Sequence, residues 1–174
     1  ITGATSGIGE ESAKELNKMG AEIIFIARNE EKGNRLKQEL QNDSGRAATM
    51  IIADLSSQAE VKKAANEFLA LNKPLDILLN NAGIMNRERN ETVDGFEEVF
   101  SVNHLAYYTF SILLAEKLKQ TKDSRVINVA SGAHQFVKDM NFEDLQSEET
   151  FKPMQVYGQS KLANILFTKS LAKK

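Results

Sequence analysis

The sequence predicts an α/β fold in which helices cover both faces of a doubly wound parallel sheet. Short apolar runs rich in β-branched residues alternate with longer amphipathic stretches along the whole chain. The apolar runs are near-continuous rather than alternating, as expected for parallel strands that are covered on both faces. Strand–helix alternation with short connections favours right-handed crossovers, which distribute the helices over the two faces of one sheet.

Four compact apolar runs are predicted to be strands, at residues 21–26, 49–53, 75–79 and 125–129. Helical periodicity between them predicts helices at roughly 7–19, 30–41, 57–71 and 95–120. A further helix is expected to start near Tyr157 and to continue to the end of the chain. A side-chain oxygen within Asp54-Leu55-Ser56-Ser57 is expected to cap the third helix.

The fourth predicted helix carries an apolar stripe at helical spacing, which we interpret as core packing, with a subunit interface as the alternative. The stripe comprises Phe96, Val99, Phe100, Leu105, Ile112 and Leu113. One long irregular stretch follows at 132–156, and loops of that length are usually functional or mobile.

Composition and charge exclude several classes of protein. The 174 residues carry a net charge of -2, which gives no electrostatic basis for nucleic-acid binding. There is no cysteine, so disulfides, thiolate catalysis and cysteine-bound zinc are excluded. His104 and His134 are too few and too far apart to predict a metal site, and we expect both to be structural or exposed to solvent. No apolar run approaches the ~20 residues of a membrane-spanning helix.

The two ends of the chain predict a single domain over 1–174 that is incomplete at both termini. The chain begins with Ile1-Thr2-Gly3 rather than methionine, and the last predicted helix runs to its end. If a first strand and later strands are missing, backbone and apolar surface are exposed, and these residues alone should be inactive and either unstable or aggregated. The compartment is left open between the cytoplasm and membranes such as the endoplasmic reticulum or mitochondrion, because no anchor is visible here.

A glycine-rich turn opens the chain, with glycines in the pattern G-x-x-x-G-x-G. Glycines permit a tight turn, let the backbone approach a pyrophosphate, and expose the N–H groups of the next helix to its negative charge. The alternative is a plain tight turn. The pattern predicts a dinucleotide site that includes Gly3, Ser6, Gly7, Ile8 and Gly9.

The end of the strand predicted at 21–26 bears on the choice of cofactor. In a Rossmann-type unit this strand end meets the adenosine ribose, and NAD enzymes usually place Asp or Glu there. This chain has Ala27 followed by Arg28, whose planar guanidinium is suited to a 2′-phosphate. The sequence therefore predicts NADP(H) over NAD(H), with a surface arginine as the alternative interpretation.

Six motifs in order make the chain resemble the short-chain dehydrogenase/reductase family over essentially its whole length. They are Thr2-Gly3-x-x-x-Gly7-x-Gly9, Asp54-Leu55, Asn80-Asn81-Ala82-Gly83, Asn103, Ser131 and Tyr157-x-x-x-Lys161. Residues 131–134 and 157–168 are similar in particular to the retinol-dehydrogenase-like branch. That branch acts on lipophilic aldehydes, retinoids and related carbonyl compounds.

The spacing of Tyr157 and Lys161 suits proton chemistry. Residues four apart share one face of a helix. A tyrosine with a pKa of about 10 is a poor base near neutral pH, but a nearby ammonium favours the phenolate. Ser131 follows a predicted strand, so its hydroxyl is expected at the carboxyl edge of the sheet. Without this context, a tyrosine and a lysine at such spacing would merely pack on the helix.

The family resemblance implies a role for each of these residues. It implies that Tyr157 is the general acid in reduction and the base in oxidation, and that Lys161 lowers its pKa and binds the nicotinamide ribose. Ser131 would hydrogen-bond the substrate oxygen, and Asn103 would help to hold a water that relays protons to Lys161; otherwise Asn103 simply bonds neighbouring backbone. The remaining cofactor contacts that the resemblance implies are Asp54, with Leu55, at the adenine, and Asn81, Ala82 and Gly83 near the ribose. A helix cap at Asp54 and a tight turn at 80–83 are compatible alternatives.

One departure from the family pattern is the long gap between Ser131 and Tyr157. Its apolar residues form either a wall over the substrate or a loop tucked on the core, and they are Phe136, Met140, Phe142, Leu145, Phe151 and Met154. A second departure is Ala130, where many relatives have a second serine; this leaves Ser131 in the catalytic position.

The expected function is hydride transfer between NADP(H) and a carbonyl or alcohol that is lipophilic, such as an aldehyde, a retinoid or a steroid-like compound. The expected partner is this small molecule, with no nucleic acid and no metal, and a homodimer is left open. The alternative is a non-catalytic cofactor-binding protein with a regulatory or scaffolding role. A sugar-nucleotide epimerase is disfavoured, because that branch resembles T-G-x-x-G-x-x-G instead.

Overall fold

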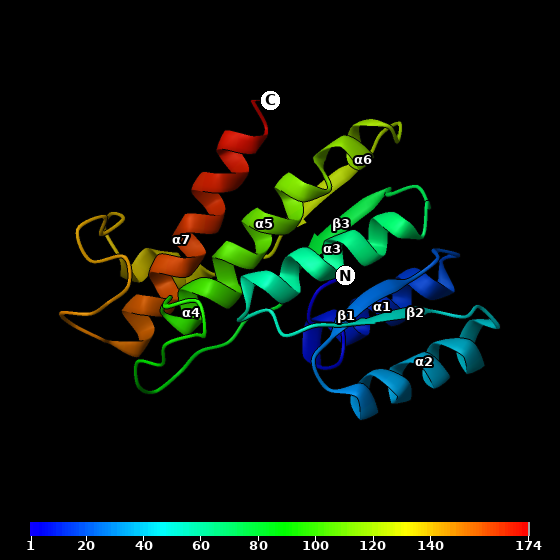
Figure 1. Ribbon diagram of the computed structural model, residues 1–174, viewed down its shortest axis with the longest axis horizontal. Coiled ribbons are helices and arrows are strands. Elements are labelled where there is room, and N and C mark those ends of the chain that lie inside the picture. The colour runs from blue at the N-terminus through cyan, green and yellow to red at the C-terminus, as the bar shows by residue number, and fades with distance from the viewer. Residues whose placement is uncertain (174) are drawn as a thin grey trace.

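The computed structural model describes residues 1–173 and has the predicted α/β architecture (Figure 1). Its strands overlap the four predicted runs and are β1 (Ile24–Ala27), β2 (Thr49–Ile52), β3 (Ile77–Asn80) and β4 (Arg125–Asn128). They form two parallel pairs, β1 with β2 and β3 with β4. The prediction of parallel strands is therefore confirmed.

The predicted helices are also present. They are α1 (Gly7–Lys18), α2 (Glu30–Ser44), α3 (Gln58–Ala70) and α7 (Pro153–Leu171). The last begins at Pro153 rather than near Tyr157, since proline is well suited to the first positions of a helix. Ser57 caps α3 by accepting a hydrogen bond from the backbone N–H of Glu60, which confirms the expected cap.

The helix predicted at 95–120 is divided into several segments. These are α4 (Glu98–Phe100), a π-helical turn (Ser101–Leu105), α5 (Ala106–Leu113) and α6 (Ala115–Lys119). The core assignment of the apolar stripe is wrong at its far end, since Ile112 is 44% and Leu113 38% exposed. A π turn takes an additional residue per turn, so a spacing of 3.6 residues does not continue across it. A subunit interface at these two residues stays a prediction.

Two apolar clusters lie on opposite faces of the strands. Ile26 of β1 belongs to one cluster, together with Phe68 of α3 and Phe110 of α5. Its neighbour Phe25 points to the other, together with Leu36 of α2. Successive residues of a strand alternate between faces, so helices cover both faces, as predicted for a doubly wound sheet.

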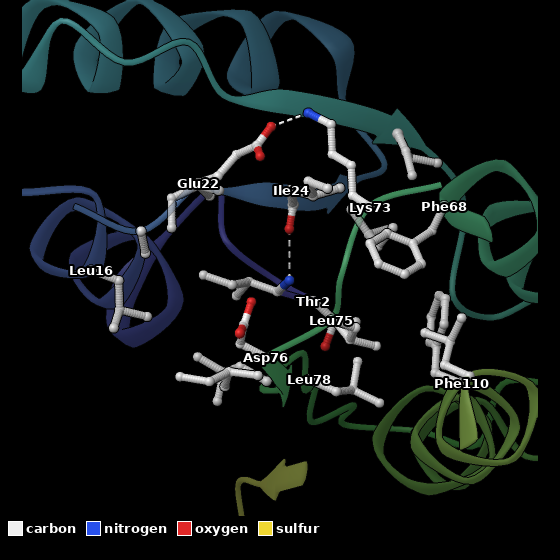
Figure 2. Close-up of a pocket in the computed structure, with 18 of the residues that line it drawn as sticks. Thr2, Leu16, Glu22, Ile24, Phe68, Lys73, Leu75, Asp76, Leu78 and Phe110 are labelled. Carbon is white, nitrogen blue, oxygen red and sulfur yellow. Dashed lines mark hydrogen bonds and ion pairs between the residues drawn. The ribbon is translucent and has the colours of Figure 1, made fainter. Parts of the chain in front are cut away.

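The two strand pairs are joined through the first residues of the chain. Thr2 forms a parallel bridge with Ile26, and its N–H donates to the Leu79 carbonyl over 3.0 Å. Towards the amino ends of β1 and β3 the strands flank an apolar groove of about 300 Å³ (Figure 2). Ile24, Phe68 and other apolar side chains line it. The carboxyl ends of the strands are thus held together, while the amino ends are separated.

Within residues 1–173, no helix has both the length and the apolar character needed to cross a bilayer.

Candidate active site

A cleft of about 490 Å³ opens at the carboxyl ends of the strands. This is where ligands bind in open α/β sheets. Most of the residues predicted from the sequence line it, namely Gly3, Ser6, Ile8, Gly9, Arg28, Asp54, Leu55, Asn81, Ala82, Gly83, Ser131, Tyr157 and Lys161. Two predicted residues, Gly7 and Asn103, are not part of its lining. The groove between β1 and β3 contains none of the predicted site residues.

The glycine turn brings backbone against backbone at one end of the cleft. Gly3 has a φ of +67°, and a Cβ there would lie 2.7 Å from the Cα of Ala82. A Cβ on Gly9 would overlap the Gly3 carbonyl oxygen. Helix α1 begins at Gly7, and the side chain of Ser6 makes no capping hydrogen bond to it. The N–H groups of the first turn are therefore left for an anion in the cleft.

The turn after β3 is fixed to the glycine turn by Thr2. The Thr2 hydroxyl accepts hydrogen bonds from the N–H groups of Asn81 (3.0 Å) and Ala82 (3.1 Å). The Asn81 amide in return donates to the carbonyls of Thr2 and Gly3. The tight turn at 80–83 therefore also forms part of the wall of the cleft, as both interpretations of these residues expected. Sequence reasoning gave Thr2 no such role, although it opens the glycine motif.

Arg28 and Asp54 lie at the ends of adjacent strands. The Arg28 side chain is 69% exposed, and its Nη1 is 3.9 Å from Asp54 Oδ2. The other oxygen of Asp54 accepts from the Ser56 N–H over 2.9 Å. Ser57 caps α3, so the alternative assignment of a helix cap to Asp54 is wrong. Among residues 1–173, the guanidinium is therefore held by a single long, exposed ion pair, which is weak in such a setting.

Tyr157 and Lys161 lie one turn apart on α7. Lys161 is 2% exposed, its Nζ donates to the Val129 carbonyl over 3.2 Å, and Nζ lies 5.5 Å from the centre of the Tyr157 ring. Burial lowers the pKa of Lys161 to about 8. A Cβ at Gly83 would lie 3.3 Å from the same Nζ. The ammonium therefore reaches the cleft beside a position that has no side chain.

Ser131 follows β4 and precedes a 3₁₀ helix over Gly132–Phe136. Its hydroxyl oxygen accepts from the Ala133 N–H over 3.2 Å, so its own proton is available to a group in the cleft. Helix α7 packs closely on this 3₁₀ helix at Gly158. A Cβ at Gly158 would lie 2.7 Å from the Ala133 carbonyl oxygen, so this contact requires glycine. Sequence reasoning missed Gly158, for which a glycine inside a predicted helix was the only signal.

Asn103 lies in the π turn and is completely buried. Its Nδ2 donates to the Ile84 carbonyl and to Ser160 Oγ, both over 3.0 Å, and its Oδ1 accepts from the Ile84 N–H over 2.8 Å. The amide thus bonds neighbouring backbone, as the structural alternative expected. A role for Asn103 in a water relay stays a prediction.

His104 belongs to the packing between the π turn and α7. Its Nδ1 is 2.9 Å from Asn164 Oδ1, and its ring lies near those of Phe100 and Phe167. Burial lowers the pKa of His104 and so favours the neutral ring. These contacts agree with the expected structural role.

The stretch between Ser131 and α7 is tucked on the core in one part, which agrees with one of the two expected arrangements, whereas a wall over the substrate stays a prediction because none of its six apolar residues lines the cleft. Phe136 is 64% and Phe142 74% exposed, whereas Leu145 is partly buried in a small pocket beside Phe100. Gln146 anchors the loop, since its side chain accepts from the Glu97 N–H over 2.7 Å. One part of the loop therefore packs on the core, and another part presents aromatic side chains.

Comparison with known proteins agrees with this geometry. A model described as short chain dehydrogenase matches residues 1–174. Retinol dehydrogenase 12 of Mus musculus is 42% identical over 175 residues, which cover 100% of this chain and 55% of the relative. The chain therefore spans about half the length of the curated relatives it matches.

Solved structures share the fold. An uncharacterised protein of Mycobacterium paratuberculosis superposes with a TM-score of 0.86 at 36% identity, over 98% of this chain and 59% of that one. A short-chain dehydrogenase of Sphingobium yanoikuyae, in complex with NADPH, has a TM-score of 0.79 at 25% identity, over 98% and 63%.

Proposed function

The chain belongs to the short-chain dehydrogenase family and is similar to its retinol dehydrogenases, and from that premise we propose an NADP(H)-dependent oxidoreductase that acts on a lipophilic carbonyl or alcohol. The observation that carries this proposal is the cleft itself. One cavity at the carboxyl ends of the strands contains Ser131, Tyr157, Lys161 and the uncapped start of α1.

The residues present fit a dinucleotide. An uncapped helix start beside three glycines suits a pyrophosphate, since side chains there would obstruct the approach of the backbone. Asp54 and Leu55 would border the adenine, Asn81 to Gly83 the ribose, and Lys161 the nicotinamide ribose. The cofactor, when bound, supplies the hydride chemistry.

Proton transfer is assigned to α7. Tyr157 would donate its hydroxyl proton to the substrate oxygen in reduction and accept a proton there in oxidation. The ammonium of Lys161 lies 5.5 Å from the centre of the Tyr157 ring, where it would stabilise the negative charge that develops on the tyrosine oxygen as the proton leaves. The hydroxyl of Ser131 would donate a hydrogen bond to the same substrate oxygen and hold it in place.

Preference for NADP(H) rests on Arg28. An acidic residue at this strand end would repel a 2′-phosphate, and here the strand ends in Ala27 and Arg28. The guanidinium is exposed and weakly paired, so a phosphate could engage it at little cost. The NADPH complex of the Sphingobium relative supports this choice.

A lipophilic substrate is favoured by the relatives and by the loop after Ser131. Phe136 and Phe142 of this loop, and Met154 at the start of α7, carry large exposed apolar side chains. Such groups suit a hydrophobic substrate, because the removal of apolar surface from water on binding is favourable in free energy. The similarity to retinol dehydrogenase 12 supports the same class.

The direct test is turnover by the full-length protein with a panel of aldehydes and ketones of increasing apolar size. We expect bulky apolar carbonyls to oxidise NADPH, which is measured as the loss of the absorbance of the reduced cofactor. Tight NADPH binding without turnover on any carbonyl or alcohol would instead indicate the non-catalytic alternative.

A further inference from the structure

Lys161 lies between two tyrosine rings from different helices. Its Nζ is 5.5 Å from the ring centre of Tyr157 on α7 and 5.7 Å from that of Tyr107 on α5. Both distances are within the range of about 6 Å over which a cation is attracted to an aromatic face. The sequence motifs contain Tyr157 and Lys161 but not Tyr107.

The two tyrosines differ in what their hydroxyls can do. Tyr107 is completely buried, and its hydroxyl donates to the Ala82 carbonyl over 2.7 Å. Burial, and secondarily the charge of Tyr157, raises the pKa of Tyr107, so it stays a neutral phenol. Tyr157 lines the cleft. Only Tyr157 is therefore placed to exchange a proton with a substrate.

Lys161 has few other groups to keep it charged. Burial opposes the ammonium, and among residues 1–173 no carboxylate lies within ion-pair distance of it. The groups that face Nζ are the Val129 carbonyl, the two tyrosine rings and the backbone at Gly83. The electron-rich faces of the rings favour the charged form of the lysine.

We propose that Tyr107 is a positioning residue for the reaction, whose ring holds Lys161 as an ammonium beside Tyr157. Its hydroxyl has a second task, since it fixes the Ala82 carbonyl in the turn that borders the cofactor site. This inference rests on the proposed oxidoreductase function. It adds a buried residue that does not line the cleft but lies against Lys161.

The test separates the ring from the hydroxyl. Tyr107→Phe keeps the ring, and a series of increasingly fluorinated phenylalanines at position 107 keeps the shape while withdrawing electrons from the face. The pKa of Lys161 is measured by NMR on the protein with isotope-labelled lysine, and its signal is assigned with Lys161→Arg. We expect Tyr107→Phe to leave this pKa unchanged and full fluorination to lower it by about one unit, the size of a desolvated cation–π contact.

The kinetic measurement is the pH profile of kcat/KM, whose alkaline limb should move to lower pH by the same amount. Tyr108→Phe on the same helix, where Tyr108 is 47% exposed, is the control and should change neither quantity. A lysine pKa that does not respond to fluorination would overturn the role of the ring. A shifted pKa in a protein that turns over no carbonyl would retain the contact and refute the oxidoreductase instead.

The hydroxyl has its own measurement. Tyr107→Phe frees the Ala82 carbonyl, so we expect the Kd for NADPH to rise several-fold with the lysine pKa unchanged. An unchanged Kd would refute the second task of Tyr107.

Discussion

Arg28 Nη1 lies 3.9 Å from Asp54 Oδ2, across the carboxyl ends of strands β1 and β2. A cation and an anion thus share the place where the adenosine end of the cofactor is expected. The anion moderates the charge of Arg28 but leaves the guanidinium accessible.

In the full-length protein, replacing Arg28 with alanine should remove the preference for NADP(H). A charge-assisted hydrogen bond contributes about 1.5–3 kcal/mol, so NADPH should bind about ten- to a hundredfold more weakly, while NADH should hardly change. Titration of both cofactors measures this, with Arg125→Ala at the amino end of β4 as a control of equal charge. Equal losses for NADPH and NADH would mean that Arg28 serves the structure.

Tyr157→Phe should abolish turnover without weakening cofactor binding, because only one hydroxyl is lost. Acid–base groups typically contribute 10²–10⁴-fold to the rate, and a fall in kcat/KM of about that size is expected. Steady-state kinetics and NADPH titration together test this. A variant that keeps more than about a tenth of the activity would contradict the assignment of Tyr157 as the proton donor.

Lys161→Met should make the fold more stable and the enzyme inactive. Burial lowers the pKa of Lys161 from 10.5 to about 8. Below pH 8, Lys161 is protonated in both the folded and the unfolded states, so burial of its charge lowers the free energy of unfolding by its full amount. Between about pH 8 and 10.5 the folded state loses it first, and the wild type gains stability as the pH rises.

The advantage of Lys161→Met in the free energy of unfolding should therefore be largest near pH 7, at about 3 kcal/mol, and should shrink towards pH 10. Urea denaturation at the two pH values measures it. Lys63→Met, at an exposed lysine paired with Glu67, should show no such dependence. An advantage independent of pH would indicate better packing rather than removal of a charge.

Gly9→Ala should disrupt the site, since its Cβ would overlap the Gly3 carbonyl oxygen and the Asn81 amide. Forcing an atom into packed backbone costs about 1–3 kcal/mol or more, and NADPH binding should be lost with the shape of the turn. Gly132→Ala is a matched control, because a Cβ there meets nothing within 4 Å. Thermal melts and cofactor titration compare the two, and equal behaviour would refute the close packing at Gly9.

Thr2→Val should destabilise the fold although its shape is preserved. The valine cannot accept the hydrogen bonds that Asn81 and Ala82 donate to the threonine hydroxyl. An unsatisfied buried donor costs about 1–3 kcal/mol, so a loss of at least that size is expected in chemical denaturation. Thr2→Ser keeps the acceptor and should recover most of the loss; a serine variant as unstable as the valine variant would assign the effect to the methyl group.

Local chemistry made much of the fold and the site predictable. Strands such as 125–129 are apolar and branched, and Gly3, Ser131 and Tyr157 come from motifs whose spacing has a direct geometric meaning. The interruption of the helix at 95–120 has no such signal, because a π turn is selected by tertiary contacts like those of Asn103. The role of Tyr107 could not be predicted from the sequence for the same reason, since only folding brings its ring against Lys161.

The π turn at Ser101–Leu105 also makes the site sensitive to the number of residues in this part of the chain. Each residue of an α-helix advances the chain by about 100° around the axis. A deletion in this turn would restore a regular helix and rotate everything after it, carrying Tyr107 away from both Lys161 and Ala82. Substitutions on the exposed side of α5 leave that alignment intact. In this part of the chain, then, the alignment of Tyr107 depends more on the number of residues than on the identity of the exposed ones.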